Sequence, residues 1–212
     1  MEFLKRLALR NGYECYVDGT TGFFEPPQLK EKPQPLLAVH CSPTETNVNH
    51  FSLEMNALTP TNVAMVQVDR LNKKTLEATV ESSRQQVLGR TPAPGLLALG
   101  VAPGQVYVSM NPTTGKTEMD TLCQELYHQA EWFISAEGEI DGNHYAHVLK
   151  PHGTVTIKGI GEAYQGVYYV THVTHTFRSN GYTQFFRAKR NALRPTGAED
   201  FAGTVSKPNP YL

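Results

Sequence analysis

Three segments, 155–161, 165–177 and 179–190, carry the clearest pattern of apolar and polar positions in the chain. They read VTIKGIG, QGVYYVTHVTHTF and SNGYTQFFRAKR, and glycines between them mark turns. Tyr, Val, Thr and Phe dominate, as is typical of strands. The pattern predicts antiparallel strands that form a closed or nearly closed barrel over residues 138–192.

Residues 2–11 have the spacing of an amphipathic helix, and Gly12 is suited to end it. The apolar face consists of Phe3, Leu4, Leu7 and Ala8. We expect this face to pack on the helix's own domain. The alternative, a basic helix on a membrane surface, is disfavoured by the short length. A hairpin of two short strands is predicted around residues 18–22.

The middle of the chain predicts further strands at 37–41, 49–57 and 61–70, then a turn at 72–74 and one more strand at 75–82. Within 61–70 both alternating faces are largely apolar. We therefore expect that strand to be buried on both sides.

The clearest helix covers residues 116–133, and Thr117 or a neighbour is expected to cap it. Its apolar stripe consists of Met119, Leu122, Leu126, Ala130 and Phe133. Prolines and glycines in 82–105 mark a domain boundary. The fold class is therefore mainly β (α+β), with antiparallel β-barrel domains and one N-terminal and one central amphipathic helix. The expected divisions are a helix plus β-rich domain at 1–90, a linker at 91–115, a helix plus C-terminal barrel at 116–193 and an extended tail at 194–212.

Composition narrows the classes of function. The 212 residues have a formal net charge of −1, which disfavours nucleic-acid binding because such proteins carry a basic excess. Cys15, Cys41 and Cys123 form no CxxC motif, which indicates reduced, mostly buried thiols in a protein made in the cytoplasm. No apolar run approaches the roughly 20 residues of a membrane helix, and charges interrupt the N-terminal apolar stretch, unlike a secretory signal.

Two glycine-containing stretches superficially suggest nucleotide binding. In NPTTGKT at 111–117, the glycine that a phosphate-binding loop needs five residues before Gly115 is Met110, and Pro112 removes a further backbone donor. In GIGEAYQG at 159–166 the glycines precede a strand, whereas a dinucleotide loop opens a helix. We expect a turn and a hairpin loop, and no cofactor.

Histidines and carboxylates also suggest chemistry. The histidines at three-residue spacing are His144, His147, His172 and His175. Residues three apart on a strand point to opposite faces, so neither pair is expected to share a metal unless a bulge intervenes. His128 and His152 lack companions at ligand spacing.

The alternating acids in AEGEIDGN are more typical of a solvated rim than of an acid/base pair. Two alternatives stay open. A small β-rich hydrolase would use Glu137, Glu139, Asp141 and His144. A carbohydrate-binding β module would use exposed aromatic side chains, for which the candidates are Tyr164, Tyr168 and Tyr182.

Several moderate motifs in order resemble one family over about residues 2–193. The motifs are EFLKRLALRNGYECYVDG followed by GFFEPP, the pair of strands in NALTPTNVAMVQVDRLNKKTLEATVES, and the C-terminal run from AEWFISAEGEIDGN to GYTQFFRAKRNAL. Within that run the turn 151–153, the strand start 166–170 and the segment 175–177 carry the likeness. The family is the phage late control protein D family, the baseplate hub of contractile phage tails. It is similar to the hub part of type VI secretion valine-glycine repeat proteins and to the hubs of extracellular contractile injection systems. Members usually have an N-terminal barrel before the first helix, which this sequence does not show.

The resemblance implies a structural protein, not an enzyme, with no metal and no cofactor. It implies a homotrimer whose barrels form a pseudo-sixfold ring, which joins the hexameric tail tube to the trimeric spike in a virion or injection particle. The implied partners are copies of itself, tube proteins and spike proteins. We expect the tail at 194–212 to run along a neighbouring subunit, with Phe201, Tyr211 and Leu212 as anchors.

Overall fold

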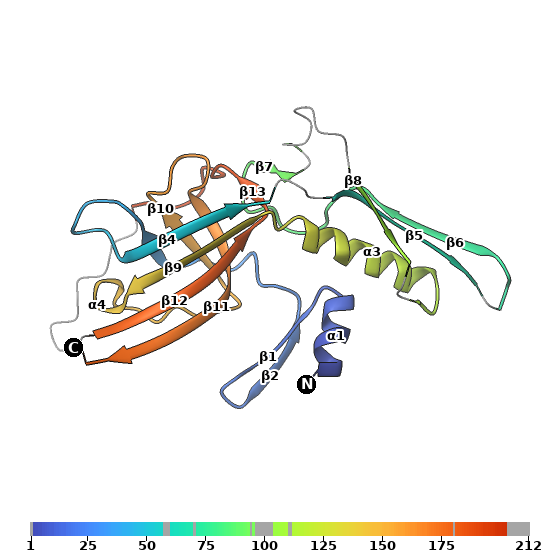
Figure 1. The fold of residues 1–212 in the computed structure, drawn as a ribbon, viewed down its shortest axis with the longest axis horizontal. Coiled ribbons are helices and arrows are strands. Elements are labelled where there is room, and N and C mark those ends of the chain that lie inside the picture. The colour runs from blue at the N-terminus through green and yellow to red at the C-terminus, as the bar shows by residue number, and fades with distance from the viewer. Residues whose placement is uncertain are drawn as a thin grey trace. The chain divides into compact units, whose positions relative to one another are not determined.

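The computed structural model describes residues 2–56, 60–69, 71–93, 95, 104–109, 112–179 and 181–202, and Figure 1 shows their fold. The chain is mainly β and divides into two compact units. Unit 1 comprises Met1–Pro27, Leu58–Gln85 and Pro94–Glu131, and unit 2 comprises Gln28–Ala57, Gln86–Ala93 and Trp132–Leu212. This division differs from the consecutive domains expected, because strands far apart in the sequence pair within unit 2.

Unit 1 begins with helix α1, Glu2–Arg10. The chain leaves the helix at Gly12, whose φ of 68° is favourable for glycine, and continues into the predicted hairpin of β1 (Glu14–Asp18) and β2 (Thr21–Glu25). Of the predicted apolar face of α1, Ala8 is buried, whereas Phe3, Leu4 and Leu7 are exposed. The expectation that this face packs on its own domain is therefore wrong for most of the face.

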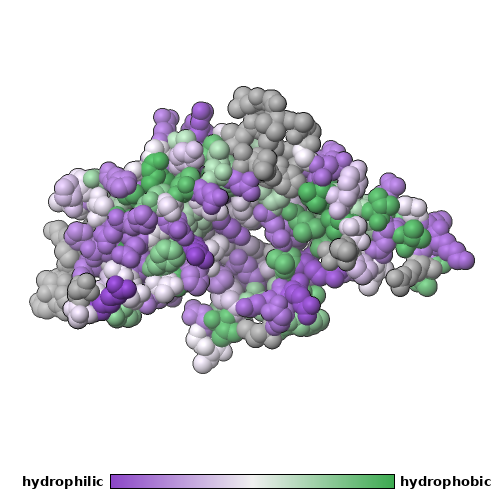
Figure 2. All heavy atoms as spheres, viewed as in Figure 1, coloured by the Kyte–Doolittle hydropathy of each residue, from purple (hydrophilic) through white to green (hydrophobic). Residues whose placement is uncertain are grey.

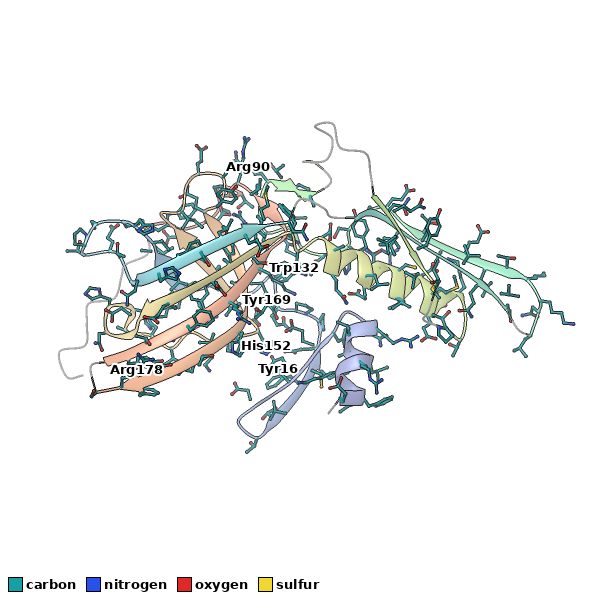
Figure 3. All side chains as sticks on the ribbon, viewed as in Figure 1. Tyr16, Arg90, Trp132, His152, Tyr169 and Arg178 are labelled. Atoms are coloured by element: carbon teal, nitrogen blue, oxygen red, sulfur yellow. The ribbon has the colours of Figure 1, made fainter. Side chains whose placement is uncertain are left out.

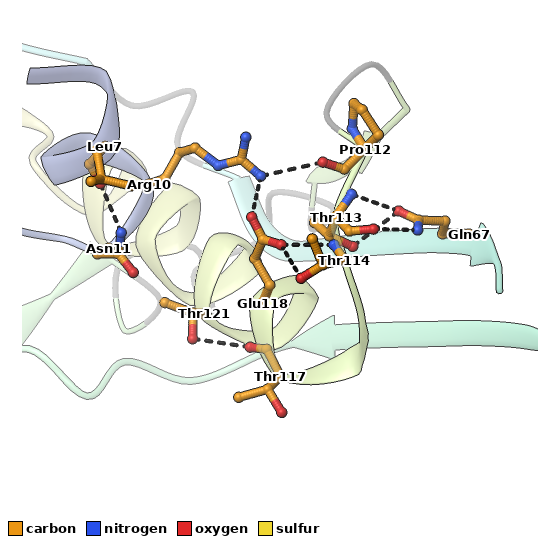
Figure 4. Close-up of polar contacts among 10 residues, drawn as sticks. All are labelled: Leu7, Arg10, Asn11, Gln67, Pro112, Thr113, Thr114, Thr117, Glu118 and Thr121. Atoms are coloured by element: carbon orange, nitrogen blue, oxygen red, sulfur yellow. Dashed lines mark hydrogen bonds and ion pairs between the residues drawn. The ribbon is translucent and has the colours of Figure 1, made fainter. Parts of the chain in front are cut away.

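Polar groups attach α1 to the rest of unit 1. The Arg10 guanidinium lies 2.6 Å from the Glu118 carboxylate and also donates to the Pro112 carbonyl oxygen (Figure 4). Gly12 lies so close to the Glu125 carboxylate that any side chain there would collide with it. The helix is thus held by its C-terminal end, which leaves the apolar side chains of its first two turns open.

A three-stranded sheet forms the rest of unit 1. Its order is β6 (Thr75–Val80), β5 (Pro60–Val68), β8 (Gly104–Val108), with β5 antiparallel to β6 and parallel to β8. Helix α3, Lys116–Ala130, covers one face of it. The core residues are Val63, Met65, Ala78, Val108, Met119, Leu122, Cys123 and Tyr127.

Burial of β5 on both sides was expected, but Val66 and Val68 are 55% and 60% exposed. Their side chains project from the face opposite to α3, because Val63 and Met65, of the other parity, are in the core with α3. Figure 2 shows apolar residues at the surface in this part of unit 1. The apolar residues Val66 and Val68 therefore lie on an exposed face of the sheet and not on a second buried face.

Helix α3 differs in two details from the prediction. It begins at Lys116, as predicted, but its N-cap residue is Gly115, so neither Thr117 nor another side chain caps it from that position. The Glu118 carboxylate instead accepts hydrogen bonds from the Thr114 backbone N–H and hydroxyl, at 2.7 and 2.8 Å (Figure 4). The helix ends at Ala130, so Phe133 lies beyond it, buried in unit 2.

Unit 2 is built on a six-stranded, curled sheet (Figure 1). In sheet order its strands are β3 (Gln34–Ala38), β10 (Thr154–Lys158), β11 (Gly166–Arg178), β12 (Gly181–Arg190), β9 (Ile134–Asp141) and β4 (Val48–Met55). The smaller elements are α4 (Gly142–Tyr145) and the pair β7 (Thr91–Pro92) and β13 (Ala192–Leu193). Neighbouring strands are antiparallel, except that β3 is parallel to β10.

The prediction of a closed or nearly closed antiparallel barrel is confirmed in part, because the strands form one curled sheet but the β3–β10 pair is parallel. The sheet is a half-barrel that ends at β3 on one side and at β4 on the other. Its inner face is filled by alternating buried residues, among them Ile140, Ile157 and Phe186. The predicted hairpin between β10 and β11 is confirmed.

A buried arginine organises the loops beside this sheet. Arg190 is inaccessible to solvent and donates four hydrogen bonds to backbone carbonyl oxygens. The acceptors and distances are Leu88 (3.0 Å), Tyr164 (2.7 Å), Gln165 (2.9 Å) and Arg194 (2.9 Å). The guanidinium also stacks 5.4 Å from the ring centre of Tyr168. One side chain thereby joins three separate segments of unit 2.

The three cysteines are free thiols, as expected. Cys123 is buried, but Cys15 and Cys41 are partly exposed, so the expected burial holds for one of them. Within the described part of the chain, no helix combines the length and apolar character needed to cross a membrane.

Candidate functional site

The acidic residues proposed for a hydrolase lie on β9, on the side opposite to its buried residues. Glu137 is 3.6 Å from Arg187 across the sheet. The Asp141 carboxylate caps α4 by accepting hydrogen bonds from the backbone N–H groups of Asn143 (2.9 Å) and His144 (3.3 Å). These groups have structural partners.

Two of those acids do share a small cavity. Glu139 and Asp141 line a space of about 280 Å³ together with Arg178 and Tyr182, and Arg178 lies at the hairpin end of β11 (Figure 3). Glu137 and His144 are not among its lining residues. The structure thus brings together half of the proposed hydrolase set.

His172 and His175 lie on opposite faces of β11, as expected, because the register with β12 is regular from His172 to His175 and its shift lies before His172. His172 shares a hydrogen bond with the Thr174 hydroxyl (3.0 Å), and His175 shares one with the Tyr182 hydroxyl (2.8 Å).

The other pair does not lie on a strand, because His144 belongs to α4 and His147 follows that helix. Among the residues described, no three His, Cys, Asp or Glu side chains are grouped as a metal site.

The tyrosines do not form one exposed row. Tyr168 is fully buried, donates to the Tyr164 carbonyl oxygen at 2.7 Å, and burial raises its pKa to about 12. Tyr182 stacks on Phe177, with ring centres 4.6 Å apart, and on His175, with ring centres 6.0 Å apart.

In the stretch 111–117, the described residues make turn contacts. The Gln67 side-chain oxygen accepts from the Thr113 backbone N–H and hydroxyl, each at 2.9 Å (Figure 4). Met110, the position that decided the argument against a phosphate loop, lies outside the described residues.

The first part of the tail is attached to unit 2. Arg194 N–H donates to the Ala163 carbonyl oxygen at 2.8 Å. Lys158 donates to the carbonyl oxygen of Phe201 at 3.2 Å, and Phe201 is half-buried. These hydrogen bonds attach residues 194 and 201 to unit 2 of the same chain. Tyr211 and Leu212 lie outside the described residues.

The six-stranded sheet has an unpaired stretch that sequence reasoning missed. Strand β11 has 13 residues, but β10 pairs with 166–169 alone. The backbone of Val170 then bonds to His152 and Gly153, at 2.9 and 2.8 Å. From residue 171 to 178, the described part of the chain pairs with β11 from the β12 side alone. The sequence did indicate this unpaired stretch, because the predicted strand segment 155–161 is shorter than its neighbour 165–177 and cannot pair with all of it.

Register identifies the backbone groups that face this open edge. Arg178 pairs with Gly181 across a two-residue turn, and such a turn places a hydrogen bond between these two residues. Hydrogen-bonded and non-hydrogen-bonded pairs alternate in antiparallel strands. The N–H and C=O groups of Val173, His175 and Phe177 therefore point away from β12, toward the open edge.

Strand β4 has the same arrangement at the end of the sheet. The Asn56 N–H donates to the Phe133 carbonyl oxygen at 2.7 Å, which sets the alternation along the strand. The backbone groups of Phe51, Leu53 and Met55 consequently face outward. Phe51 and Leu53 lie opposite Gly138 and Ala136.

Both open edges also share a side-chain pattern. Gly138 and Ala136 are on the buried side of β9, so the outward-facing residues of β4 direct their side chains to the inner face of the half-barrel. On β11, His175 lies opposite the buried Gln184 and Phe177 opposite Tyr182. Residues 48–55 and 171–177 contain no lysine or proline, which are the residues that commonly protect exposed edges. These two edges are the candidate interaction site.

The arrangement of strands defines the class of fold, which is that of phage tail proteins of known structure. The tail protein of Neisseria meningitidis MC58 has a TM-score of 0.63 to this chain at 12% identity, over 90% of this chain and 54% of that one. The 43 kDa tail protein of prophage MuSo2 from Shewanella oneidensis has a TM-score of 0.63 at 12% identity, over 91% of this chain and 54% of that one.

The chain therefore spans about half the length of these two structures. A chain of a native gene transfer agent virion matches more weakly, with a TM-score of 0.43 at 13% identity over 99% of this chain and 40% of that one. No model of a known protein family matches the chain, and no curated protein matches it.

Proposed function

We propose that this chain is a structural subunit of a phage tail or phage-like injection particle. The observation that carries the proposal is the fold, which two phage tail proteins share over 90% or more of this chain. Identity of 12% preserves the backbone arrangement and not the surface chemistry. An inherited architecture suits a protein whose task is to occupy a position in an assembly.

Within the tail, we propose the position of the hub, where a trimer of this chain joins the hexameric tube to the trimeric spike. This finer assignment is supported by the resemblance of residues 2–193 to the late control protein D family. Exposed apolar groups also support it, because large apolar patches on soluble proteins often mark interaction sites. They occur on α1, on the outer face of β5 and along the open edges of unit 2.

The tail provides a further contact in this proposal. Phe201, Tyr211 and Leu212 are proposed to anchor it on a neighbouring subunit. Ending the chain after Ala202 keeps the Lys158 and Arg90 bonds to residues 196–201, so the fold should be retained while particle assembly is lost. Assembly of this truncated chain at the parental level would show that the terminal residues do not belong to the proposed interface.

A deletion and complementation experiment tests the structural role against the hydrolase. Removing the gene from a producing strain should yield no complete tails by electron microscopy, and the parental gene should restore them. The variant Glu139→Gln/Asp141→Asn should restore them as well, because Asn caps a helix about as well as Asp. Complete tails without the gene would contradict a structural role, and failure of this variant alone would favour the acid cluster as a catalytic site.

A further inference from the structure

We infer that the open edge of β4 in one copy pairs antiparallel with the open edge of β11 in a second copy, so that the half-barrels join head to tail. The inference deepens the proposed function, on which it rests for its setting in a tail particle. The strand pairing itself follows from the geometry of unit 2 and can be tested on the chain alone.

Strand direction favours this pairing. In the sheet, β11, β12, β9 and β4 are successively antiparallel, so β4 runs opposite to β11. A second copy placed with its β11 beside β4 in the same sheet continues the alternation without a break. Antiparallel addition of a strand to an exposed edge is a recurrent mode of protein association.

The two edges match in length and in backbone phase. Each presents three residues with outward N–H and C=O groups, which are Phe51, Leu53 and Met55 on β4 and Val173, His175 and Phe177 on β11. Antiparallel alignment with Leu53 opposite His175 brings Phe51 opposite Phe177 and Met55 opposite Val173. Each such pair exchanges two hydrogen bonds.

The side chains match on the inner face as well. Met55 and Phe177 are 43% and 77% exposed in the single chain. In the joined sheet both project to the same side as their apolar partners, and cross-strand apolar and aromatic pairs stabilise a sheet. The pairing therefore covers Phe177, which is the most exposed aromatic side chain among the residues of unit 2 that the structure describes.

Charges on the outer face are largely compatible. Glu54 lies diagonally across from His172 in this register, an attractive pair when the histidine is protonated. His50 lies opposite Arg178, which is unfavourable when His50 is protonated and neutral otherwise. The joined edges thus combine one attractive and one repulsive contact, and each of the two requires a protonated histidine.

The two edges are different, so the contact is heterologous, and repetition generates a closed ring or an open filament. A two-fold contact of β11 with itself would instead place His175 opposite His175. That symmetric contact predicts a different cross-link from the heterologous one, so the two contacts can be distinguished by experiment.

Engineered cysteines separate these outcomes. In a Cys15→Ser/Cys41→Ser background, which leaves the buried Cys123, one chain carries Leu53→Cys and another carries His175→Cys. Hydrogen-bonded antiparallel pairs have Cα atoms about 5.5 Å apart, within the range that a disulfide spans. Under oxidation, we expect a covalent dimer when the two chains are mixed and none when either is alone.

A dimer from His175→Cys alone would overturn the inference in favour of the two-fold contact, and a dimer from Leu53→Cys alone would indicate β4 with itself. The same variants are examined in assembled tails. If the chain is present in tails and no mixed cross-link forms there or in solution, the inference fails. If the mixed cross-link forms but the chain is absent from tails, the proposed function fails and the pairing stands.

A proline pair provides a second, independent readout. His175→Pro removes an outward N–H, a position where edge strands tolerate proline, whereas His175→Ala keeps it. We expect the alanine variant to associate as the parent does in sedimentation, and the proline variant to remain a single chain with an unchanged melting temperature. Parental association of the proline variant would overturn the pairing.

If proline instead lowers the melting temperature, amide exchange in the parent decides. The amides of Val173, His175 and Phe177 should exchange at least about tenfold more slowly in the associated state than in the free chain. The amides of Thr174 and Thr176, which face β12, should be protected in both states. Equal exchange of the first group in the two states would contradict the pairing.

Discussion

Replacing Arg190 by methionine tests how unit 2 holds its loops together. The guanidinium donates to four carbonyl oxygens, but two of these keep another donor after the change. Tyr164 still receives the Tyr168 hydroxyl at 2.7 Å, and Arg194 still receives the Arg90 N–H at 3.1 Å. The carbonyl oxygens of Leu88 and Gln165 lose the bond that Arg190 supplies.

The magnitude follows from those two oxygens. Leaving a buried polar group unsatisfied costs about 1–3 kcal/mol, which gives roughly 2–6 kcal/mol for both. Removing a buried charge returns part of its desolvation cost, so we expect a loss of about 2–4 kcal/mol. Lysine should recover little, because one ammonium cannot reproduce the fork of the guanidinium.

Trp132, the single tryptophan of the chain, lies in unit 2 and reports its unfolding. With a denaturant slope of about 2 kcal/mol per molar, the urea midpoint of Arg190→Met should fall by about 1–2 M. Arg187→Met is the matched control, because the Arg187–Glu137 pair is exposed and worth under about 1 kcal/mol. Equal midpoints for the two variants would refute the role assigned to Arg190.

Three further predictions concern the cores and the alkaline limit. Leu122 lies in the core of unit 1, so Leu122→Ala should lower the free energy of unfolding by about 2–5 kcal/mol, measured by chemical unfolding followed by circular dichroism. Leu126 is partly buried, so Leu126→Ala should cause a smaller loss. The reverse order would contradict the packing of α3. Gly12→Ala should lower the melting temperature of unit 1, because a residue with a Cβ pays about 1–2 kcal/mol at this positive φ and the new Cβ also displaces the end of the Glu125 side chain. An unchanged melting temperature would contradict the strain assigned to this position. The pKa of Tyr168 is raised by burial to about 12, above about 10 in an unfolded chain, so its contribution to stability is complete below pH 10 and is lost as the pH rises toward 12. Tyr168→Phe should remove that part of the alkaline loss in melting curves, and an identical pH profile would contradict the assignment.

Local features were predictable from the sequence and long-range pairing was not. The hairpins around residues 18–22 and 159–166 follow from glycine positions and alternation within a few residues. The parallel pairing of β3 with β10 joins residues more than 100 positions apart, such as Gln34 and Val155. No periodicity encodes that contact, which places β3 at one end of the sheet, beside a strand from the C-terminal part of the chain.

Single residues show the same limit. Arg190 stands in the stretch RAKR and resembles a surface residue in sequence, yet it is fully buried. Its partners are backbone carbonyl oxygens, which every residue has, so the sequence contains no sign of them. Val66 and Val68 are apolar and yet exposed. An apolar residue favours a site away from water, but its sequence does not say whether the same chain or a partner subunit covers it.

Electron cryo-microscopy of purified, complete tails from a producing strain tests the central claim most directly. The account predicts that density for this chain lies at the junction of tube and spike, in three copies, with the sheet continuous from β4 of one copy to β11 of the next. Tails whose density is fully explained by other proteins would contradict the assignment of this chain as a structural tail subunit.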